Sequence, residues 1–438
     1  MLRARGKTGR QGNWLAGVVV LSLGWVLIYA ARTALSSALK EIGDYWGLST
    51  AYLGFLSSSF FISYSILQIP TGVLADRFGS RRLLLAGFGV QAIGLFLGSA
   101  SQVPAQFLMA RILTGAGQAT YFACQQAIIS FTLPPEHRAA GTAGTMAGAG
   151  LGGAAGFLLG KFLSTSRLGW KMPFAVLGVL SAGYILLVLG VVPEPRPAKG
   201  ARASKARKPE HPAAATTEAG AGSSVSKRPA VDPGWGFLGY VTASHFLSMY
   251  GFYLMLTWLP YYLETARGYK GRLSAVIPIV MPLIMAPATI IWGMISDRRR
   301  QRGFVLRIAL PLAALATAAV PAMRSPVALC LALALYGATG KLVVDVDLVA
   351  TVADSSPPET RGSTLAILNM GAALAMVAAP AVTGFVAQVT GSFDVSFYIA
   401  GLFNILALLG FMQGMKVLAR AEGVATRRAV PGTAGPGC

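Results

Sequence analysis

The sequence predicts an all-α integral membrane protein with 12 transmembrane helices arranged in two pseudo-symmetric six-helix bundles. Its composition is 54% hydrophobic and 12% charged, whereas a soluble chain carries about a quarter charged residues. Apolar runs recur along the chain, and crossing a hydrocarbon core of about 30 Å takes roughly 20 such residues. In addition, sequence elements of the first half recur in the second at a nearly constant offset.

The apolar runs define twelve predicted spans, six on each side of a long polar break. In chain order they cover residues 14–34, 50–71, 83–101, 104–128, 140–163, 172–192, 235–262, 273–296, 304–323, 326–350, 362–389 and 395–416.

Basic residues are distributed unevenly between the loops. Most of the 37 Lys and Arg residues lie before the first span, after the last one, or in alternate loops between them. Excess Lys and Arg mark the cytoplasmic side of a membrane protein. We therefore expect both termini inside, in the inner membrane if the source is bacterial. The net charge of +21 records this topology, so the bilayer rather than nucleic acid is the expected large partner.

The break between the sixth and seventh spans divides the chain. Residues 194–233 are rich in Ala, Pro, Ser, Lys and Arg, and such a segment is predicted to be a disordered cytoplasmic linker. It separates an N-terminal bundle at 14–193 from a C-terminal bundle at 234–416. Cytoplasmic tails at 1–13 and 417–438 complete the chain, and a monomer is expected because the two halves bury each other.

Two short motifs repeat between the halves. GVLADR at 72–77 closes the second span and GMISDR at 293–298 closes the eighth, an offset of 221 residues. PPEHR at 134–138 and PPETR at 357–361 follow the fourth and tenth spans, an offset of 223 residues. Parallel halves with a substrate site between them at the membrane midplane are typical of rocking transporters.

The loop after the second span carries a family resemblance. Its pattern GxxxDRxGxRR at 72–82 resembles the signature loop between helices 2 and 3 of the major facilitator superfamily, and Asp297-Arg298 is a degenerate echo of it. The resemblance implies a cytoplasmic gate, for which carboxylates and guanidinium groups at helix ends are suited. The alternative is a basic loop that only sets topology. The predicted gate residues are Gly72, Asp76, Arg77, Gly79, Arg81, Asp297 and Arg298.

Three further stretches resemble the anion:cation symporter family, whose members move organic anions such as sugar acids and glutamate. They are YAARTALS at 29–36, RILTGAGQ at 111–118 and TWLPYYL at 257–263. The resemblance implies that Arg32 binds the substrate anion and Tyr64 a substrate hydroxyl. Independently, an arginine inside a span is costly and by default functional, and its planar fork suits a carboxylate or phosphate. The alternative for Arg32 is a place at the outer membrane interface.

Other polar residues within the spans extend the candidate substrate site. Arg111 is expected either to pair within the N-terminal half or to contact the anion a second time. Lys341 is the pseudo-symmetry mate of Gln118, since both repeats share the 223-residue offset. Lys161 and Arg307 lie near span ends and are predicted to reach the lipid headgroups, while a lone span histidine, His245, is expected to be a packing residue. The substrate-binding candidates are Arg32, Tyr64, Arg111, Gln118, Tyr253, Lys341 and Asn369.

Two carboxylates in the tenth span are candidates for proton coupling. Asp345 shares a helix face with Lys341, with which it is spaced to form an ion pair, and Asp347 points to the other side. Proton-coupled members of the resembled family often carry an acid before the first-helix arginine and a glutamate seven residues after the fourth-helix arginine. Here those positions are Ala31 and Gln118. We hypothesise that coupling, if present, has moved to Asp345 or Asp347; either one could instead only neutralise Lys341.

The sequence therefore predicts a secondary transporter that carries a small organic anion, such as a sugar acid or carboxylate, by alternating access, without a cofactor or metal. It contains no Walker lysine loop, G-x-S-x-G elbow or H-E-x-x-H motif, and three His and three Cys form no catalytic or metal cluster. An enzyme or a channel is thus disfavoured. Two alternatives keep the fold: an organophosphate exchanger using Arg32 and Lys341, and a drug or neutral-solute exporter.

Overall fold

A computed structural model of the chain describes residues 14–164, 166–193, 234–269, 271–299, 303–357 and 360–429. The predicted N-terminal tail, the predicted linker and the last nine residues lie outside this part. Within it, helices are joined by short turns, and the described residues form no β-strand.

The first half contains seven α-helices and one 3-10 turn. They are α1 (Trp14–Trp46), α2 (Thr50–Phe78), α3 (Ser80–Ala100), α4 (Pro104–Ala119), α5 (Tyr121–Thr132), α6 (Pro135–Ser164), η1 (Gly169–Lys171) and α7 (Met172–Val191).

The second half repeats this order with eight α-helices and two 3-10 turns. They are α8 (Gly234–Thr265), α9 (Arg272–Val276), η4 (Ile277–Ile279), α10 (Val280–Arg299), α11 (Phe304–Ala319), η5 (Val320–Ala322), α12 (Pro326–Thr339), α13 (Lys341–Ser355), α14 (Arg361–Thr390) and α15 (Asp394–Ala429).

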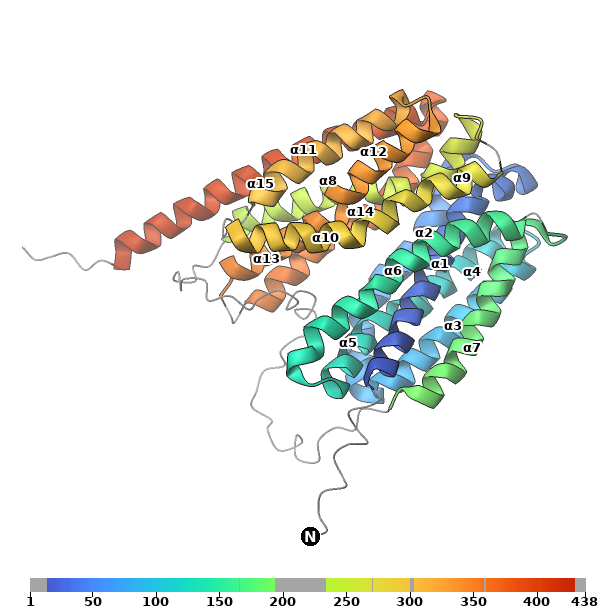
Figure 1. Cartoon of the computed structure of the whole chain (residues 1–438), viewed down its shortest axis with the longest axis horizontal. Helices are drawn as coiled ribbons and strands as arrows, with labels where there is room; N and C mark the ends of the chain where they lie inside the picture. Colours follow the sequence, from blue (N-terminus) through green and yellow to red (C-terminus); the bar gives the residue numbers. More distant parts are fainter. Residues whose placement is uncertain are drawn as a thin grey trace, which may run out of the picture.

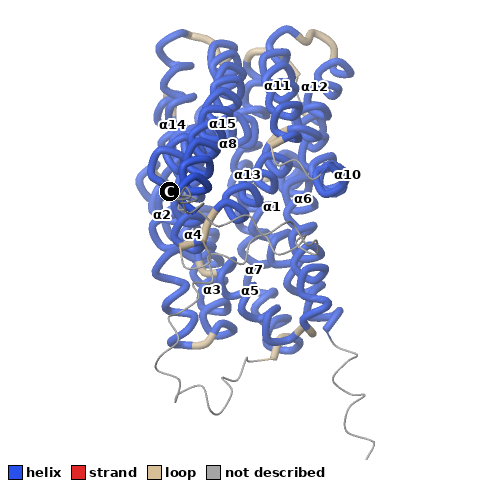
Figure 2. The backbone as a smooth tube through the Cα atoms, turned by 90° about the vertical axis from the view of Figure 1, so that its left-hand side faces the viewer, coloured by secondary structure: helices blue, strands red, loops and turns tan. Residues whose placement is uncertain are grey.

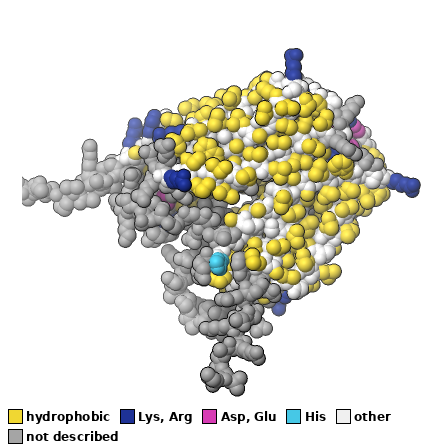
Figure 3. Space-filling view, viewed as in Figure 1, with side chains coloured by type: hydrophobic (Ala, Val, Ile, Leu, Met, Phe, Trp, Pro, Cys, Tyr) yellow, Lys and Arg dark blue, Asp and Glu magenta, His cyan; other side chains and the backbone are white. Residues whose placement is uncertain are grey.

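The membrane-spanning architecture agrees with the prediction. Ten helical stretches of the described chain are long and apolar enough to cross a membrane. The other two predicted spans correspond to α8 and to the pair α4–α5, which Thr120 interrupts. Large apolar side chains cover much of the face shown in Figure 3. A surface this apolar is a liability in water but is the expected lipid-facing surface of a membrane protein.

The helices form two bundles that meet at one end. In Figure 1 the ribbons of α1–α7 and α8–α15 converge at one end and diverge toward the other, and Figure 2 shows the two groups from the diverging end. Where they meet, Thr50 of α2 donates from its hydroxyl to the Gly384 carbonyl of α14 at 2.9 Å. Ser58 of α2 donates in the same way to the Val377 carbonyl at 2.7 Å.

An ion-pair cluster also joins the bundles at this end. Lys161 Nζ, at the end of α6, lies 2.6 Å from Glu41 Oε1 of α1 and 2.6 Å from Glu264 Oε1 of α8. The prediction that Lys161 reaches the headgroups is therefore wrong: its side chain is 13% exposed and paired on both sides. Sequence reasoning missed this because both partners lie on other helices. We call this end of the molecule the Lys161 end.

The opposite end carries the α2–α3 turn, and we call it the Asp76 end. Gly79 makes the turn with φ 93°, a conformation that costs other residues a steric penalty. Asp76, Arg77 and Arg298 are exposed, and Arg81 donates from Nη2 to the Leu189 carbonyl at 2.6 Å. The Asp297 side chain lies outside the described part, and the gate assigned to Gly72, Asp76 and their neighbours stays a prediction.

Two helices differ from their predicted form in ways that position the site. The first span was predicted to end at residue 34, but α1 continues to Trp46, so Arg32 lies near the middle of the helix and not at an interface. The fourth and tenth spans are each interrupted, at Thr120 and at Gly340. These interruptions lie beside Gln118 and Lys341, which the sequence repeat pairs. Broken helices at equivalent positions of two halves are typical of transporter binding sites.

Candidate functional site

Arg32 is buried among aromatic rings on the inner face of α1. It is 7% exposed. Its guanidinium carbon lies 5.0 Å from the Tyr29 ring centre and 4.8 Å from that of Tyr64, with Phe60 and Phe61 at 5.5 and 5.9 Å. Aromatic faces attract a cation without neutralising it. The rings therefore hold the guanidinium in place and leave its hydrogen-bond donors for another partner.

Gln118 orients this guanidinium from α4. Arg32 Nε donates to Gln118 Oε1 at 3.0 Å, and Gln118 Nε2 donates to the Ile28 carbonyl at 3.4 Å. The second bond sets the amide so that its oxygen faces the arginine. Arg32 Nη2 is buried with no hydrogen-bond partner in the described chain. Because the amide is neutral, the positive charge of Arg32 stays uncompensated.

Arg111 provides a second buried guanidinium from α4. It is 3% exposed, and its guanidinium carbon lies 4.6 Å from the Phe60 ring centre. Its Nε and Nη1 atoms are buried without a hydrogen-bond partner in the described residues. None of the ion pairs formed within the described ranges involves Arg32 or Arg111. An unpaired buried cation is strongly destabilising, so an anion from outside the chain would satisfy both groups.

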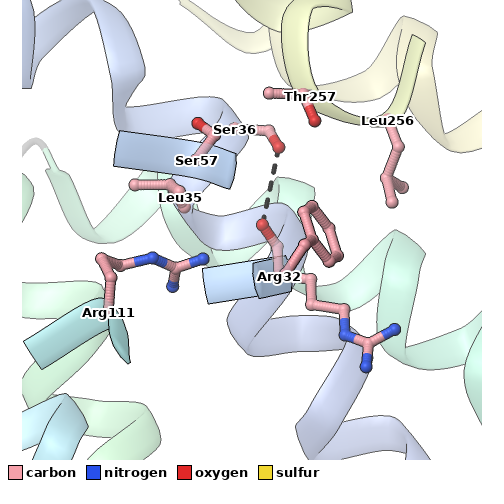
Figure 4. Close-up of a pocket in the computed structure, with 8 residues that line it drawn as sticks. Arg32, Leu35, Ser36, Ser57, Arg111, Leu256 and Thr257 are labelled. Atoms are coloured by element: carbon pink, nitrogen blue, oxygen red, sulfur yellow. Dashed lines mark hydrogen bonds between the residues drawn. The ribbon is translucent and has the colours of Figure 1, made fainter. Parts of the chain in front are cut away.

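A cavity connects the two arginines to the second bundle. Figure 4 shows it between α1, α2, α4 and α8, with the Arg111 guanidinium extending from α4 toward α1. Both bundles contribute to the wall, since α8 supplies Leu256 and Thr257. The lining residues are Arg32, Leu35, Ser36, Ser57, Phe61, Arg111, Leu256 and Thr257. The cavity thus has two cations, three hydroxyls and apolar walls at the boundary that must move during transport.

The second bundle contains a linked lysine, aspartate and histidine. Lys341 Nζ lies 2.6 Å from Asp345 Oδ2, and His245 Nε2 of α8 lies 2.6 Å from Asp345 Oδ1. His245 Nδ1 lies 3.0 Å from the Leu368 carbonyl. A carbonyl only accepts, so Nδ1 carries a hydrogen, and the short contact between Nε2 and the carboxylate oxygen requires a further proton between them. The cluster therefore holds one titratable proton.

Asp347 has a different environment. It is 3% exposed. Ser296 Oγ donates to its Oδ1 at 3.1 Å, and the Gly303 amide donates to its Oδ2 at 3.2 Å. These bonds tie α13 to the end of α10 and the start of α11. The geometry accounts for Asp347 as a residue that joins helices.

The remaining predicted residues are dispersed. Tyr253 is buried on α8 and contacts the Phe61 ring of the first bundle, with ring centres 5.6 Å apart. Asn369 is exposed on α14. His245 had been expected to be a packing residue; its partnership with Asp345 links positions 100 residues apart, and only its ability to titrate inside a span signalled it.

The chain was compared with known proteins and solved structures. The sequence profile of the Major Facilitator Superfamily matches residues 21–346. A probable sulfoacetate transporter, SauU, of Cupriavidus necator is 26% identical over 89% of this chain and 90% of its own length. A hexuronate transporter of Bacillus subtilis is 26% identical over 90% of this chain and 94% of its own.

A solved structure supports the same fold. The xylose transporter XylE of E. coli, in an inward open conformation, aligns with a TM-score of 0.73 at 19% identity, covering 94% of this chain and 99% of that one.

Proposed function

The chain belongs to the Major Facilitator Superfamily, and from this premise we propose that it carries a small organic anion across the membrane by alternating access, with Arg32 as the ligand of the anion. The fold and the relatives are those of transporters and not of enzymes. The observation that carries the proposal is the Arg32 guanidinium, which is buried in the middle of α1, has an unpartnered Nη2 atom and forms no ion pair with a described carboxylate.

The relatives support an anionic cargo. Their printed substrates, sulfoacetate and hexuronate, are organic acids, and they align along most of this chain. A planar guanidinium binds two oxygens of such an acid at once. In this proposal Gln118 orients Arg32, and the hydroxyl and amide groups of Tyr64, Tyr253 and Asn369 contact the polar groups of the substrate.

The arrangement of the bundles suits one state of an alternating-access cycle. Contacts between the bundles gather at the Lys161 end, and the ribbons diverge toward the Asp76 end. The Lys- and Arg-rich loops assign the Asp76 end to the cytoplasm. We therefore propose that this conformation faces inward, with both termini cytoplasmic, and that a single chain in the inner membrane is the working unit.

We further propose that transport is coupled to protons through Asp345. The cluster of His245, Asp345 and Lys341 holds a proton in a short contact at the interface of α8 and α13. Asp347, the other candidate, spends both carboxylate oxygens on bonds that join helices. The geometry therefore favours Asp345 as the coupling carboxylate.

Uptake of labelled sugar acids and small carboxylates into proteoliposomes tests the proposal. Arg32→Gln keeps the size and polarity of the side chain and should abolish nearly all uptake, and Arg32→Lys should retain only part of it because the fork is lost. Arg307→Gln removes an exposed span cation of α11 and is the matched control. Full uptake by Arg32→Gln would show that Arg32 is not the anion ligand, and would return the drug or neutral-solute exporter to first place.

A further inference from the structure

The charges around the cavity do not balance. Lys341, the cation of the second bundle, is neutralised by Asp345 at 2.6 Å. The two guanidinium groups of the first bundle have no such partner in the described chain, and three of their nitrogen atoms are buried without a hydrogen bond. The cavity therefore carries two uncompensated positive charges. A ligand with one negative charge would leave one of them unpaired.

The two guanidinium groups are close, yet each has its own position. Both pack against the Phe60 ring, at 5.5 Å for Arg32 and 4.6 Å for Arg111, so their central carbons are at most about 10 Å apart. Figure 4 shows them directed to separate places around the cavity. A single carboxylate fills one guanidinium fork, so a second anionic group is needed to fill the other.

We infer that the substrate is a small organic dianion with two separate acidic groups, the first bound by Arg32 and the second by Arg111. This inference rests on the proposed function and adds the number of acidic groups and the role of Arg111. The hydroxyls of Ser36, Ser57 and Thr257 line the space beside the arginines and suit polar groups between the two acids. Selectivity follows, because a monoanion leaves a buried guanidinium unpaired, and an unpaired buried group is what discriminates most strongly between ligands.

Equilibrium binding to the purified full-length protein tests this with three probes of similar size. D-Glucuronate has one carboxylate, D-glucarate has two, and glucose 6-phosphate has a single group that carries up to two charges. The diacid should bind about tenfold to a hundredfold more tightly than the monoacid, since a charge-assisted bond supplies that difference. Equal affinity for monoacid and diacid would overturn the inference, and so would tighter binding of the phosphate ester than of the diacid.

Variants assign the second group to Arg111. Arg111→Gln should lower the affinity for the diacid to that for the monoacid and leave monoacid binding unchanged, which also shows that the variant is folded. Arg32→Gln should remove binding of both. Equal loss of both acids in folded Arg111→Gln protein, with its melting temperature retained, would overturn the role of Arg111. If the wild-type protein binds neither acid, the proposed function itself fails, and this inference fails with it.

Discussion

Lys161 Nζ lies 2.6 Å from Glu264 Oε1, and this ion pair joins the first bundle to the second at the end where they meet. The same ammonium group lies 2.6 Å from Glu41 of its own bundle, and Ser274 donates to the same Glu264 oxygen at 2.6 Å. One lysine therefore balances two carboxylates, and its loss would leave two acids facing each other across the boundary.

Lys161→Met should open the Lys161 end. Without the ammonium group, repulsion between Glu41 and Glu264 replaces an attraction, at a cost of about 1–3 kcal/mol to the closed state. Spin labels at exposed Gln102 and Arg324, one on each bundle, should report a longer mean distance.

Lys40→Met is the matched control for that experiment. Lys40 pairs with Asp44 on the same helix and is more exposed, so its loss should leave the label distance unchanged. If both variants give the wild-type distance, the Lys161 cluster does not hold this end closed.

Gln118→Glu should make transport depend on pH in a new way. A glutamate carboxylate at this place would pair with Arg32 Nε, which now donates to the amide at 3.0 Å, and would compete with the substrate. When protonated, the glutamate resembles the native glutamine. Uptake should therefore be near normal below the pKa of the new carboxyl group and fall by about tenfold or more above it.

Gln118→Ala separates orientation from charge. It removes the hydrogen bond to Arg32 and adds no titratable group, so uptake should fall by a similar factor at all pH values. A pH–uptake profile of Gln118→Glu that parallels the wild type would mean that Gln118 and Arg32 do not act together during transport.

Asp345→Asn and Asp347→Asn should have different effects. An amide at position 345 cannot share a proton with His245 as the carboxylate does at 2.6 Å, so uptake should lose its response to an imposed pH gradient. An amide at position 347 weakens the bonds from Ser296 and the Gly303 amide. That variant should melt at a lower temperature, by about 1–3 kcal/mol of stability, and keep its pH response.

Measurement of gradient-driven uptake and of melting temperature for both variants decides between these carboxylates. A response lost in Asp347→Asn and kept in Asp345→Asn would reverse the assignment. His245→Gln should behave as Asp345→Asn does, because the same proton is lost.

Gly54→Ala should also disfavour closure of the Lys161 end. A Cβ atom at Gly54 of α2 would lie 2.4 Å from the Pro380 carbonyl oxygen of α14, far inside contact distance, so the two helices would have to separate. The same spin-label pair should report an increased distance. Gly89→Ala on α3, where a Cβ atom meets nothing within 4 Å, is the control and should match the wild type.

Much of the fold was predictable because membrane insertion depends on properties that are local in sequence. A span needs about 20 apolar residues, and ten of the twelve predicted segments meet that criterion as helical stretches of the described chain. The repeated DR motifs placed the halves in register, and the same register relates the helix interruptions beside Gln118 and Lys341. Where prediction fell short, as at the end of α1, the residues beyond position 34 are good helix formers that continue past the most apolar stretch.

The sequence by itself determined the membrane class, the two halves, and the presence of costly charges such as Arg32 and Arg111 inside spans, because each of these follows from residue type and near neighbours. Only the tertiary structure decided which charges have partners. Lys161 found two acids, Asp345 found His245, and Asp347 found Ser296 and a backbone amide, while Arg32 and Arg111 found no carboxylate in the described chain. The reason is physical: an ion pair forms within a few ångströms of space, and helices that are distant in sequence supply the partner.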